Sequence, residues 1–362
     1  MGVEKFSAWL EAHAPQATTV VKLDMFKGYA LAVDMDNLIY KMLKVAQKQV
    51  ISETDLSQDE LDETELNNLT RRMVMAKISE LIEHGITPVC VFDGPSHPLK
   101  QHKANKNRAA KEKLMSRLEE AKNALRSADP LWRSQKLVDD YAKYLKQATY
   151  VSSSFSSDLY HMLSALGIPV LKGGEPCVSH IEAKDAEGLC ATLCINKYCI
   201  AAYTTDSDFH FYGGDTQITD ISHGNATVRT LANILQQAQI TYNQFVDMCI
   251  LLGNDFNPNI RGIALVNAWK KLQKYGSIDA MALYEDVSVL NHKAVRALVT
   301  STIQRIQFDP RLIKETFQSE YKEILATHKL SSYGERIMRT LFPTPTLTPS
   351  MVANLPSNVM RL

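Results

Sequence analysis

The sequence has no apolar run of about eighteen residues, the shortest stretch that indicates a membrane-spanning helix. Its first residues, Met1 to Phe6, lack the order of basic and then apolar residues that a secretory signal has. Phe6 also stands where a myristoylation motif requires Ser or Thr. We therefore expect no membrane contact and no secretion, and a location in the nucleus or the cytoplasm.

The six cysteines include no Cys-x-x-Cys pair, a frequent arrangement of zinc ligands. Cys190, Cys194 and Cys199 lie close enough in the sequence for a zinc site to be conceivable. Several cysteines stand within apolar runs, however, as Cys249 does in Cys249–Leu252. This pattern favours buried, reduced side chains that serve packing.

The chain has no net charge at pH 7, because 40 Lys and Arg balance 40 Asp and Glu. A nucleic-acid-binding protein usually presents a basic surface to phosphates. The charges are segregated, however: Lys100–Lys146 contains thirteen bases and six acids, and Glu53–Glu65 contains seven acids and no base. The basic segment has a helical pattern and predicts a helical hairpin. Its positive charge suits the path of nucleic-acid phosphates, and a hairpin whose charges only face solvent is the alternative. The acidic segment is expected to face away from nucleic acid or to regulate its entry.

Short apolar runs that end in a carboxylate recur along the chain. Tyr29–Asp34, Ile86–Asp93 and Cys199–Asp206 each end in Asp, and Ile168–Leu171 is a further apolar run. Segments of helical periodicity separate them, such as Leu66–His84, which Gly85 follows. This alternation predicts an α/β fold with a mostly parallel central sheet flanked by helices. The acids would then meet at one edge of the sheet, where such folds bind ligands.

Seven acidic residues form the candidate site. They are three acids that end apolar runs, two acid-x-acid pairs of which one includes the last of those three, and one acid behind an apolar helix: Asp34, Asp93, Asp185, Glu187, Asp206, Asp208 and Asp255. Clustered carboxylates repel one another unless cations neutralise them, and their hard oxygen atoms suit Mg²⁺ or Mn²⁺. Two such ions about 4 Å apart activate water and stabilise the leaving oxygen in phosphodiester hydrolysis. Helix capping and strand-end solvation are the alternative, which explains single acids better than all seven.

The acids stand in five blocks: Val33-Asp34; Gly85–Gly94, followed by Leu99-Lys100; Asp185-Ala186-Glu187; Asp206-Ser207-Asp208; and Phe245–Asp255, followed by Ile260–Ile263. Over residues 1 to about 279, these blocks resemble those of the flap endonucleases and XPG-type structure-specific 5′ nucleases, which have a PIN-like core. The resemblance implies two Mg²⁺ ions, for which Mn²⁺ can substitute. The first four acids would mainly hold one ion and the last three the other, with Glu187 near both.

The resemblance also implies a domain organisation. Residues 1–99 and 158–240 would form the α/β nuclease core, 100–157 a helical arch for a single-stranded 5′ end, and 241–341 a helical region with a helix–two-turn–helix motif. The tail 342–362 is rich in Pro and Thr and is predicted to be extended, without a sliding-clamp docking box. We expect a monomer. The absence of this box suggests a diverged member of the family that is encoded by a virus and acts at the viral replication site.

The chain departs from the family pattern beside the acids. Asp185 replaces a Glu, and Glu182 is the alternative ligand if the register differs. Lys100 stands where the family offers a Lys to the scissile phosphate, but Asn107 occupies the place of an Arg seven residues later. Arg108, one position further on, points about 80° away from Lys100 on a helix.

Lys100 and Arg108 are nevertheless the predicted catalytic cations. Lys103 and Lys111 lie near the helix face of Lys100 and are predicted to contact nucleic acid, with a solvated face as the alternative. Tyr40 is predicted to stack on a base at the cut site, unless it belongs to the core.

The segment Arg261, Gly262 and Ile263 resembles the hairpin of the helix–two-turn–helix motif, which binds one duplex strand through backbone amides and a K⁺ ion. Ala264 stands where the family prefers Gly, so phosphate contact is expected to be weaker. Lys270, on the following helix, is predicted to compensate.

The resemblance implies a Mg²⁺-dependent 5′ flap endonuclease that also degrades duplex or nicked DNA from 5′ ends, in replication, repair or recombination. A 5′→3′ exoribonuclease is the alternative, because Trp9-Leu10, Asp34-Met35 and Leu252–Phe256 are reminiscent of those enzymes, and RNA is then the substrate. A non-catalytic nucleic-acid scaffold is less well supported, because all seven acidic positions keep a carboxylate.

Overall fold

A seven-stranded sheet forms the centre of the computed structural model, which describes residues 2–58, 60–129, 133–148, 150–175, 184–257, 260, 265–301, 325–326 and 330–341. The strand order is β1-β7-β6-β5-β2-β3-β4. The strands are β1 (Thr18–Lys22), β2 (Ala30–Asp34), β3 (Thr87–Phe92), β4 (Val170–Lys172), β5 (Ala201–Tyr203), β6 (Thr216–Ser222) and β7 (Asn225–Thr230). The five strands from β6 to β4 are parallel, whereas β7 pairs antiparallel with β6 and β1. The predicted α/β fold with a mostly parallel sheet is therefore confirmed.

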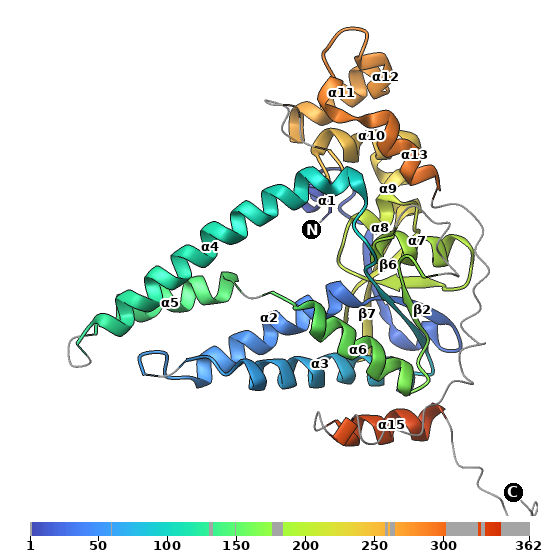
Figure 1. The fold of residues 1–362 in the computed structure, drawn as a ribbon. Coiled ribbons are helices and arrows are strands. Elements are labelled where there is room, and N and C mark those ends of the chain that lie inside the picture. The colour runs from blue at the N-terminus through green and yellow to red at the C-terminus, as the bar shows by residue number, and fades with distance from the viewer. Residues whose placement is uncertain are drawn as a thin grey trace, which may run out of the picture.

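Helices cover both faces of the sheet (Figure 1). They are α1 (Phe6–His13), α2 (Met35–Glu53), α3 (Glu63–Glu83), α4 (Gln101–Ser127), α5 (Gln135–Ala148), α6 (Ser153–Ala165), α7 (Ala186–Ile195), α8 (Asp208–Phe211), α9 (Leu231–Ala238), α10 (Tyr242–Leu252), α11 (Leu265–Tyr275), α12 (Ile278–Met281), α13 (His292–Ser301) and α15 (Ser331–Leu341). None of the helices in the described ranges is long and apolar enough to cross a membrane.

Alternation along the strands divides the core into two layers. On β2, Ala32 packs towards α1, α7 and α10, whereas its neighbours Leu31 and Val33 pack towards α2, α3 and α6. Successive side chains of a strand point to opposite faces, and both faces are covered here, so β2 and β3 are continuous apolar runs. This burial fixes the register that places the strand-end acids.

The sequence patterns did not predict β1, β6 and β7. These strands have exposed or partly exposed positions, and β6 and β7 form a hairpin through His223 and Gly224. Both turn residues have positive φ, as hairpin turns require. The hairpin and β1 widen the sheet beside β5, and Gln217 of β6 donates to the backbone oxygen of Asp206 (2.6 Å).

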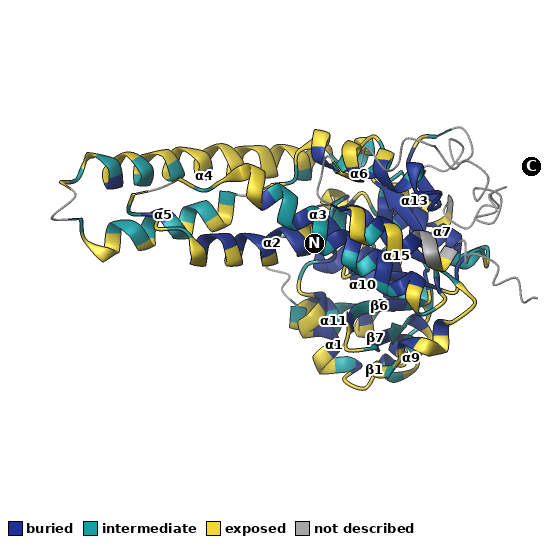
Figure 2. Cartoon of the chain, turned by 90° about the horizontal axis from the view of Figure 1, so that it is seen from below, coloured by how far each residue is buried: buried dark blue, intermediate teal, exposed yellow. Residues whose placement is uncertain are grey.

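Helices α4 and α5 form a hairpin that projects from the sheet, as predicted for the basic segment (Figures 1 and 2). The sequence predicts an interruption of this segment near Ala128-Asp129-Pro130, and α4 ends at Ser127 with Ala128 as its C-cap. The acidic stretch between α2 and α3 is not a free loop, because it packs against this hairpin. Glu60 pairs with Lys122 (2.8 Å), Arg126 donates to the Ser57 carbonyl (3.1 Å), and Leu56 packs in an apolar cluster with residues of α4 and α5.

Candidate metal centre

The first two acids lie at the carboxyl ends of adjacent parallel strands. Asp34 ends β2, caps α2 by accepting from the Asn37 N–H (3.0 Å), and accepts from the Thr204 hydroxyl (2.7 Å). Asp93 follows β3 and accepts from the Ala186 N–H at the start of α7 (2.8 Å). Asp93 thereby joins the second acidic block to the third.

The third block lies at the N-terminus of α7. Asp185 caps this helix by accepting from the Gly188 N–H (3.0 Å), and it also accepts from the Tyr212 hydroxyl (2.9 Å). Glu187 stands in the first turn of the same helix. The shorter Asp185 therefore still reaches the cluster, whereas the alternative ligand Glu182 lies outside the described residues.

The remaining acids follow β5 and α10. Asp206 accepts from the backbone N–H of Asp208 (3.1 Å) through its side chain. Asp208 begins α8 and is fully buried, and neither of its carboxylate oxygens has a hydrogen-bond partner among the described residues. Asp255 follows α10, and its carboxylate faces the Lys103 ammonium (3.3 Å).

Mutual repulsion links all seven carboxylates. Burial, first, and then the charge of neighbouring acids raise the pKa of Asp34, Glu187 and Asp208 well above its ordinary value. Loss of solvation and then the charge of Asp36 raise the pKa of Asp93 to about 7, although this residue is exposed at the surface. The repelling pairs run without a break through the cluster: Asp34 with Asp93, Asp93 with Asp185, Asp185 with Glu187, Glu187 with Asp206, Asp206 with Asp208, and Asp208 with Asp255. The structure thus brings the seven predicted acids together.

The donor set fits hard divalent cations. A buried carboxylate without hydrogen bonds, as at Asp208, is costly unless a proton or a cation neutralises it. Nevertheless, within the described part of the chain no three His, Cys, Asp or Glu side chains are arranged so that they could hold a metal ion. Binding an ion therefore requires these side chains to move closer together.

The cysteines, unlike the carboxylates, do not form a candidate metal site. Burial raises the pKa of Cys190, Cys194 and Cys199 above its ordinary value, which keeps their thiols protonated. Zinc binds thiolates. Cys190 and Cys199 belong to the hydrophobic core and Cys194 packs against it, so the three side chains contribute to packing, as the apolar runs suggested.

Two cations from the α4 side enter the cluster. Lys100 pairs with Asp185 (2.8 Å) and lies 5.0 Å from the centre of the Phe256 ring. Burial lowers the pKa of Lys100, but the carboxylates of Asp185 and Glu187 outweigh this effect and hold the pKa well above its usual value. Lys103 approaches Asp255, as described above. Arg108 instead contacts Asn105 on its own helix (3.5 Å).

The other predicted contacts are spread over the surface. Lys111 lies 3.5 Å from the centre of the Tyr150 ring. Tyr40 is exposed on α2, with the Lys44 ammonium 5.4 Å from its ring centre, so it is not a core residue. Lys270 is exposed on α11. Arg261, Gly262 and Ile263 lie outside the described residues.

Sequence reasoning missed two neighbours of the acids. Asp36 accepts from the backbone N–H of Asp93 (2.7 Å) and from the Ser156 hydroxyl (3.3 Å), so it holds the second block in place. Asp34-Met35-Asp36 is a third acid-x-acid pair, and this signal was available. Gly2 has positive φ, and a Cβ there would overlap Asp206 Oδ1 and lie 2.9 Å from Asp208 Oδ1, so no larger residue fits.

Comparison with known proteins agrees with this geometry. The model of the XPG N-terminal domain matches residues 1–114, and that of the XPG I-region matches residues 178–255. The flap endonuclease 1 of Entamoeba dispar is 28% identical over 284 residues, which cover 77% of this chain and 69% of that protein. The flap endonuclease 1-A of Oryza sativa subsp. japonica is 28% identical over 286 residues, covering 78% and 68%.

Solved structures show the same fold at low sequence identity. The flap endonuclease-1 of Methanococcus jannaschii is 16% identical and has a TM-score of 0.56, and the alignment covers 90% of this chain and 96% of that one. The catalytic core of Rad2 in complex with DNA substrate has a TM-score of 0.57 at 17% identity, with 94% and 99% covered.

The fold and the carboxylate cluster define an α/β protein of the nuclease class. The two family models belong to one family and together match more than half of the chain. The chain therefore belongs to the XPG-type family of flap endonucleases, as its motifs predicted.

Proposed function

We propose that the protein is a 5′ nuclease that uses divalent metal ions, Mg²⁺ or in its place Mn²⁺, to cut DNA at 5′ flaps and to degrade duplex or nicked DNA from 5′ ends. The observation that carries this proposal is the unbroken chain of seven carboxylates, with Asp208 buried and without a hydrogen-bond partner among the described residues. Such a set requires cations, and phosphodiester hydrolysis uses them.

The acids would hold two metal ions, and the lysines beside them would contact the scissile phosphate. Asp34, Asp93, Asp185 and Glu187 would mainly hold one ion, and Asp206, Asp208 and Asp255 the other, beside Glu187. Bound ions supply an activated water and neutralise the leaving oxygen. Lys100, now paired with Asp185, would turn its ammonium to the scissile phosphate, and Lys103 would provide a second charge. Arg108 would take part if it rotates towards the cluster.

Nucleic-acid contacts would extend from this centre. Residues 100–157 would act as the arch for a single-stranded 5′ end, with Lys111 on its path and Tyr40 against a base at the cut. Residues 241–341 would hold the duplex, through Lys270, Arg261, Gly262 and Ile263 and a K⁺ ion. The other proposed units are the nuclease core, 1–99 with 158–240, and the tail 342–362. We propose that a monomer acts on DNA in replication, repair or recombination, in the nucleus or the cytoplasm.

The relatives support DNA as the substrate, because they are flap endonucleases and the Rad2 core is in complex with DNA substrate. The test gives the purified protein Mg²⁺ or Mn²⁺ and three substrates: a 5′-flap DNA, a nicked duplex and a 5′-phosphorylated single-stranded RNA. We expect the flap to be cut fastest. Preference for the RNA would replace the proposal with the exoribonuclease, and no cleavage with either ion would leave a nucleic-acid scaffold.

The matched control is Asp206→Asn, which removes one charge from the cluster without changing the shape of the side chain. We expect this variant to bind flap DNA but not to cut it. Cutting at a rate near that of the wild type would contradict the assignment of Asp206 as a metal ligand.

A further inference from the structure

One face of α4 leads from the acids to an apolar cavity. Lys100 and Lys103, at the start of this face, pair with Asp185 and Asp255. Lys111 follows, with its ammonium over the Tyr150 ring. Further along, Met115 and Leu118 line the cavity. Fifteen residues separate Lys100 from Met115, which corresponds to about 22 Å along a helix.

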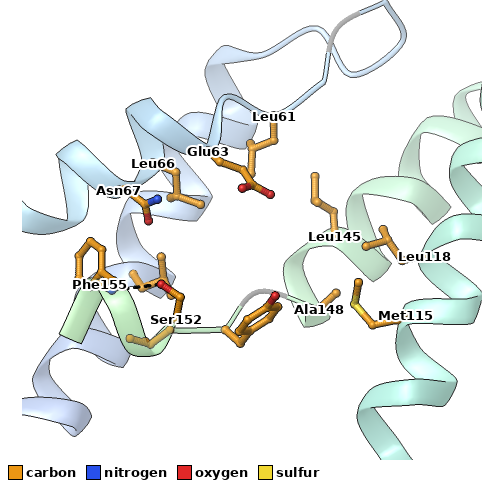
Figure 3. A pocket seen from close by; sticks show the side chains of 13 residues that line it. Leu61, Glu63, Leu66, Asn67, Met115, Leu118, Leu145, Ala148, Ser152 and Phe155 are labelled. Carbon is orange, nitrogen blue, oxygen red and sulfur yellow. Dashed lines mark hydrogen bonds between the residues drawn. The ribbon is translucent and has the colours of Figure 1, made fainter. Parts of the chain in front are cut away.

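The cavity lies between the α4–α5 hairpin and the body of the protein, and its volume is about 230 Å³ (Figure 3). Leu118 and Leu145 contribute from the hairpin, and Leu66 and Phe155 from α3 and α6. As the structure describes it, the lining contains no Lys or Arg. The walls are therefore suited to an apolar, flat group and not to a phosphate.

Four polar side chains also line the cavity: Glu63, Asn67, Tyr150 and Ser152, whose hydroxyl accepts from the Phe155 N–H (3.2 Å). Glu63 and Asn67, on α3, line the cavity next to Leu61 and Leu66 in Figure 3. Tyr150 lines it as well, and 57% of its surface is exposed. Carboxylate, carboxamide and hydroxyl groups recognise the edges of nucleobases, and an aromatic ring supplies a surface on which a base stacks.

We propose that this cavity receives one nucleobase of the single-stranded 5′ end, while Lys111 at Tyr150 meets the adjoining phosphate. The proposal rests on the proposed function, because it extends the path of the same strand beyond the carboxylates. A cavity of about 150 Å³ is large enough to bind benzene in another protein, so this one has room for a base. A base can also form hydrogen bonds with Glu63 and Asn67, which a purely apolar ligand cannot.

The test uses a series of 5′-flap DNA substrates, each with a single abasic nucleotide at a different position of the flap. Binding to the full chain is measured with a chelator present, so that the DNA stays uncut. At one flap position we expect loss of the base to weaken binding about tenfold, as loss of one base–aromatic stack does. Tyr150→Ala should bind the intact flap about tenfold more weakly and show no such position. Asn67→Trp, which fills the cavity, should behave in the same way.

Two variants serve as controls. Tyr150→Phe keeps the ring and should keep the position dependence. Tyr29→Ala removes a tyrosine of similar exposure, 54%, at the start of β2 and thus at the opposite edge of the sheet from the acids, and it should bind as the wild type does.

Two results would overturn the proposal: binding that is equally strong for every abasic position, and a position dependence that persists in Tyr150→Ala. Either result is also expected if the cavity holds a protein side chain and not a base. Such a result with normal flap cutting in Mg²⁺ refutes the base site alone. Absence of both binding and cutting refutes the proposed function. Circular dichroism and thermal unfolding of each variant show whether it is folded.

Discussion

Replacing Asp93 by asparagine should stabilise the metal-free protein at high pH and only there. The carboxyl of Asp93 has its pKa raised from 3.8 to about 7, by loss of solvation first and then by the charge of Asp36, although the residue is exposed at the protein surface. A raised pKa means that the folded state holds the proton more tightly than the unfolded chain. Stability is therefore lost as the pH rises from about 4 through 7, in contrast to the usual behaviour of an acid.

The magnitude follows from the size of the shift. A shift of about three pKa units corresponds to about 4 kcal/mol at a pH well above 7. This is an upper bound for the variant, because Asp93 is exposed, so that solvent screens its repulsion, and because the neighbouring acids relax when one charge is removed. The asparagine side chain keeps an oxygen that accepts from the Ala186 N–H, so the bond of 2.8 Å between the second and third blocks survives. Charge is thus the main property that changes.

The assay is urea unfolding of the wild type and Asp93→Asn in chelator, at about pH 4 and pH 8.5. We expect similar stabilities at the lower pH and a more stable variant at the higher one. Other titrating groups occur in both proteins and cancel in the difference. Added Mg²⁺ should stabilise the wild type, by about 2.7 kcal/mol at a hundredfold excess over its dissociation constant, and should stabilise the variant less. A variant that is no more stable than the wild type at pH 8.5 would refute this electrostatic account.

Three further changes test other parts of the structure. Lys100→Met should slow flap cutting about 10²- to 10³-fold in single-turnover assays. Lys106→Met, at an exposed position of α4, is the control, and equal cutting rates of the two variants would contradict the role of Lys100. Burial lowers the pKa of His210 to about 4, so the free energy of unfolding should fall by up to about 3 kcal/mol as the pH drops from 6.5 towards 4. If His210→Asn loses as much stability over this pH range as the wild type does, His210 is not the cause. Arg296→Met leaves the buried Asp247 without its cation (2.6 Å) and should cost about 3–5 kcal/mol in urea unfolding, whereas no loss would show that the pair is dispensable.

The sequence alone determined the elements that carry most of the candidate site. Asp34 and Asp93 were predictable because period and composition identify a buried parallel strand, and the carboxyl ends of such strands meet at one edge. The projecting hairpin was predictable too, because two polar helical segments flank a break at Ala128. These are local properties of the chain, and local sequence encodes them.

Other features became visible only in the tertiary structure. Strands β1, β6 and β7 are partly exposed, so their sequences lack the apolar runs that mark β2 and β3. The contact of Asp36 with the Asp93 backbone joins residues 57 positions apart, and no local pattern specifies it.

The same holds for the acidic stretch and for the cavity. Charge alone suggested that the acidic stretch would face away from the nucleic-acid path or control entry to it, and this stays a prediction; only the fold shows that the stretch packs against α4 and α5 through Glu60 and Leu56. The cavity exists only because α2, α3, α4, α5 and α6 meet around it. Periodicity tells which face of a helix is apolar, but the opposing surface comes from distant parts of the chain, so only the packed structure decides what that face meets.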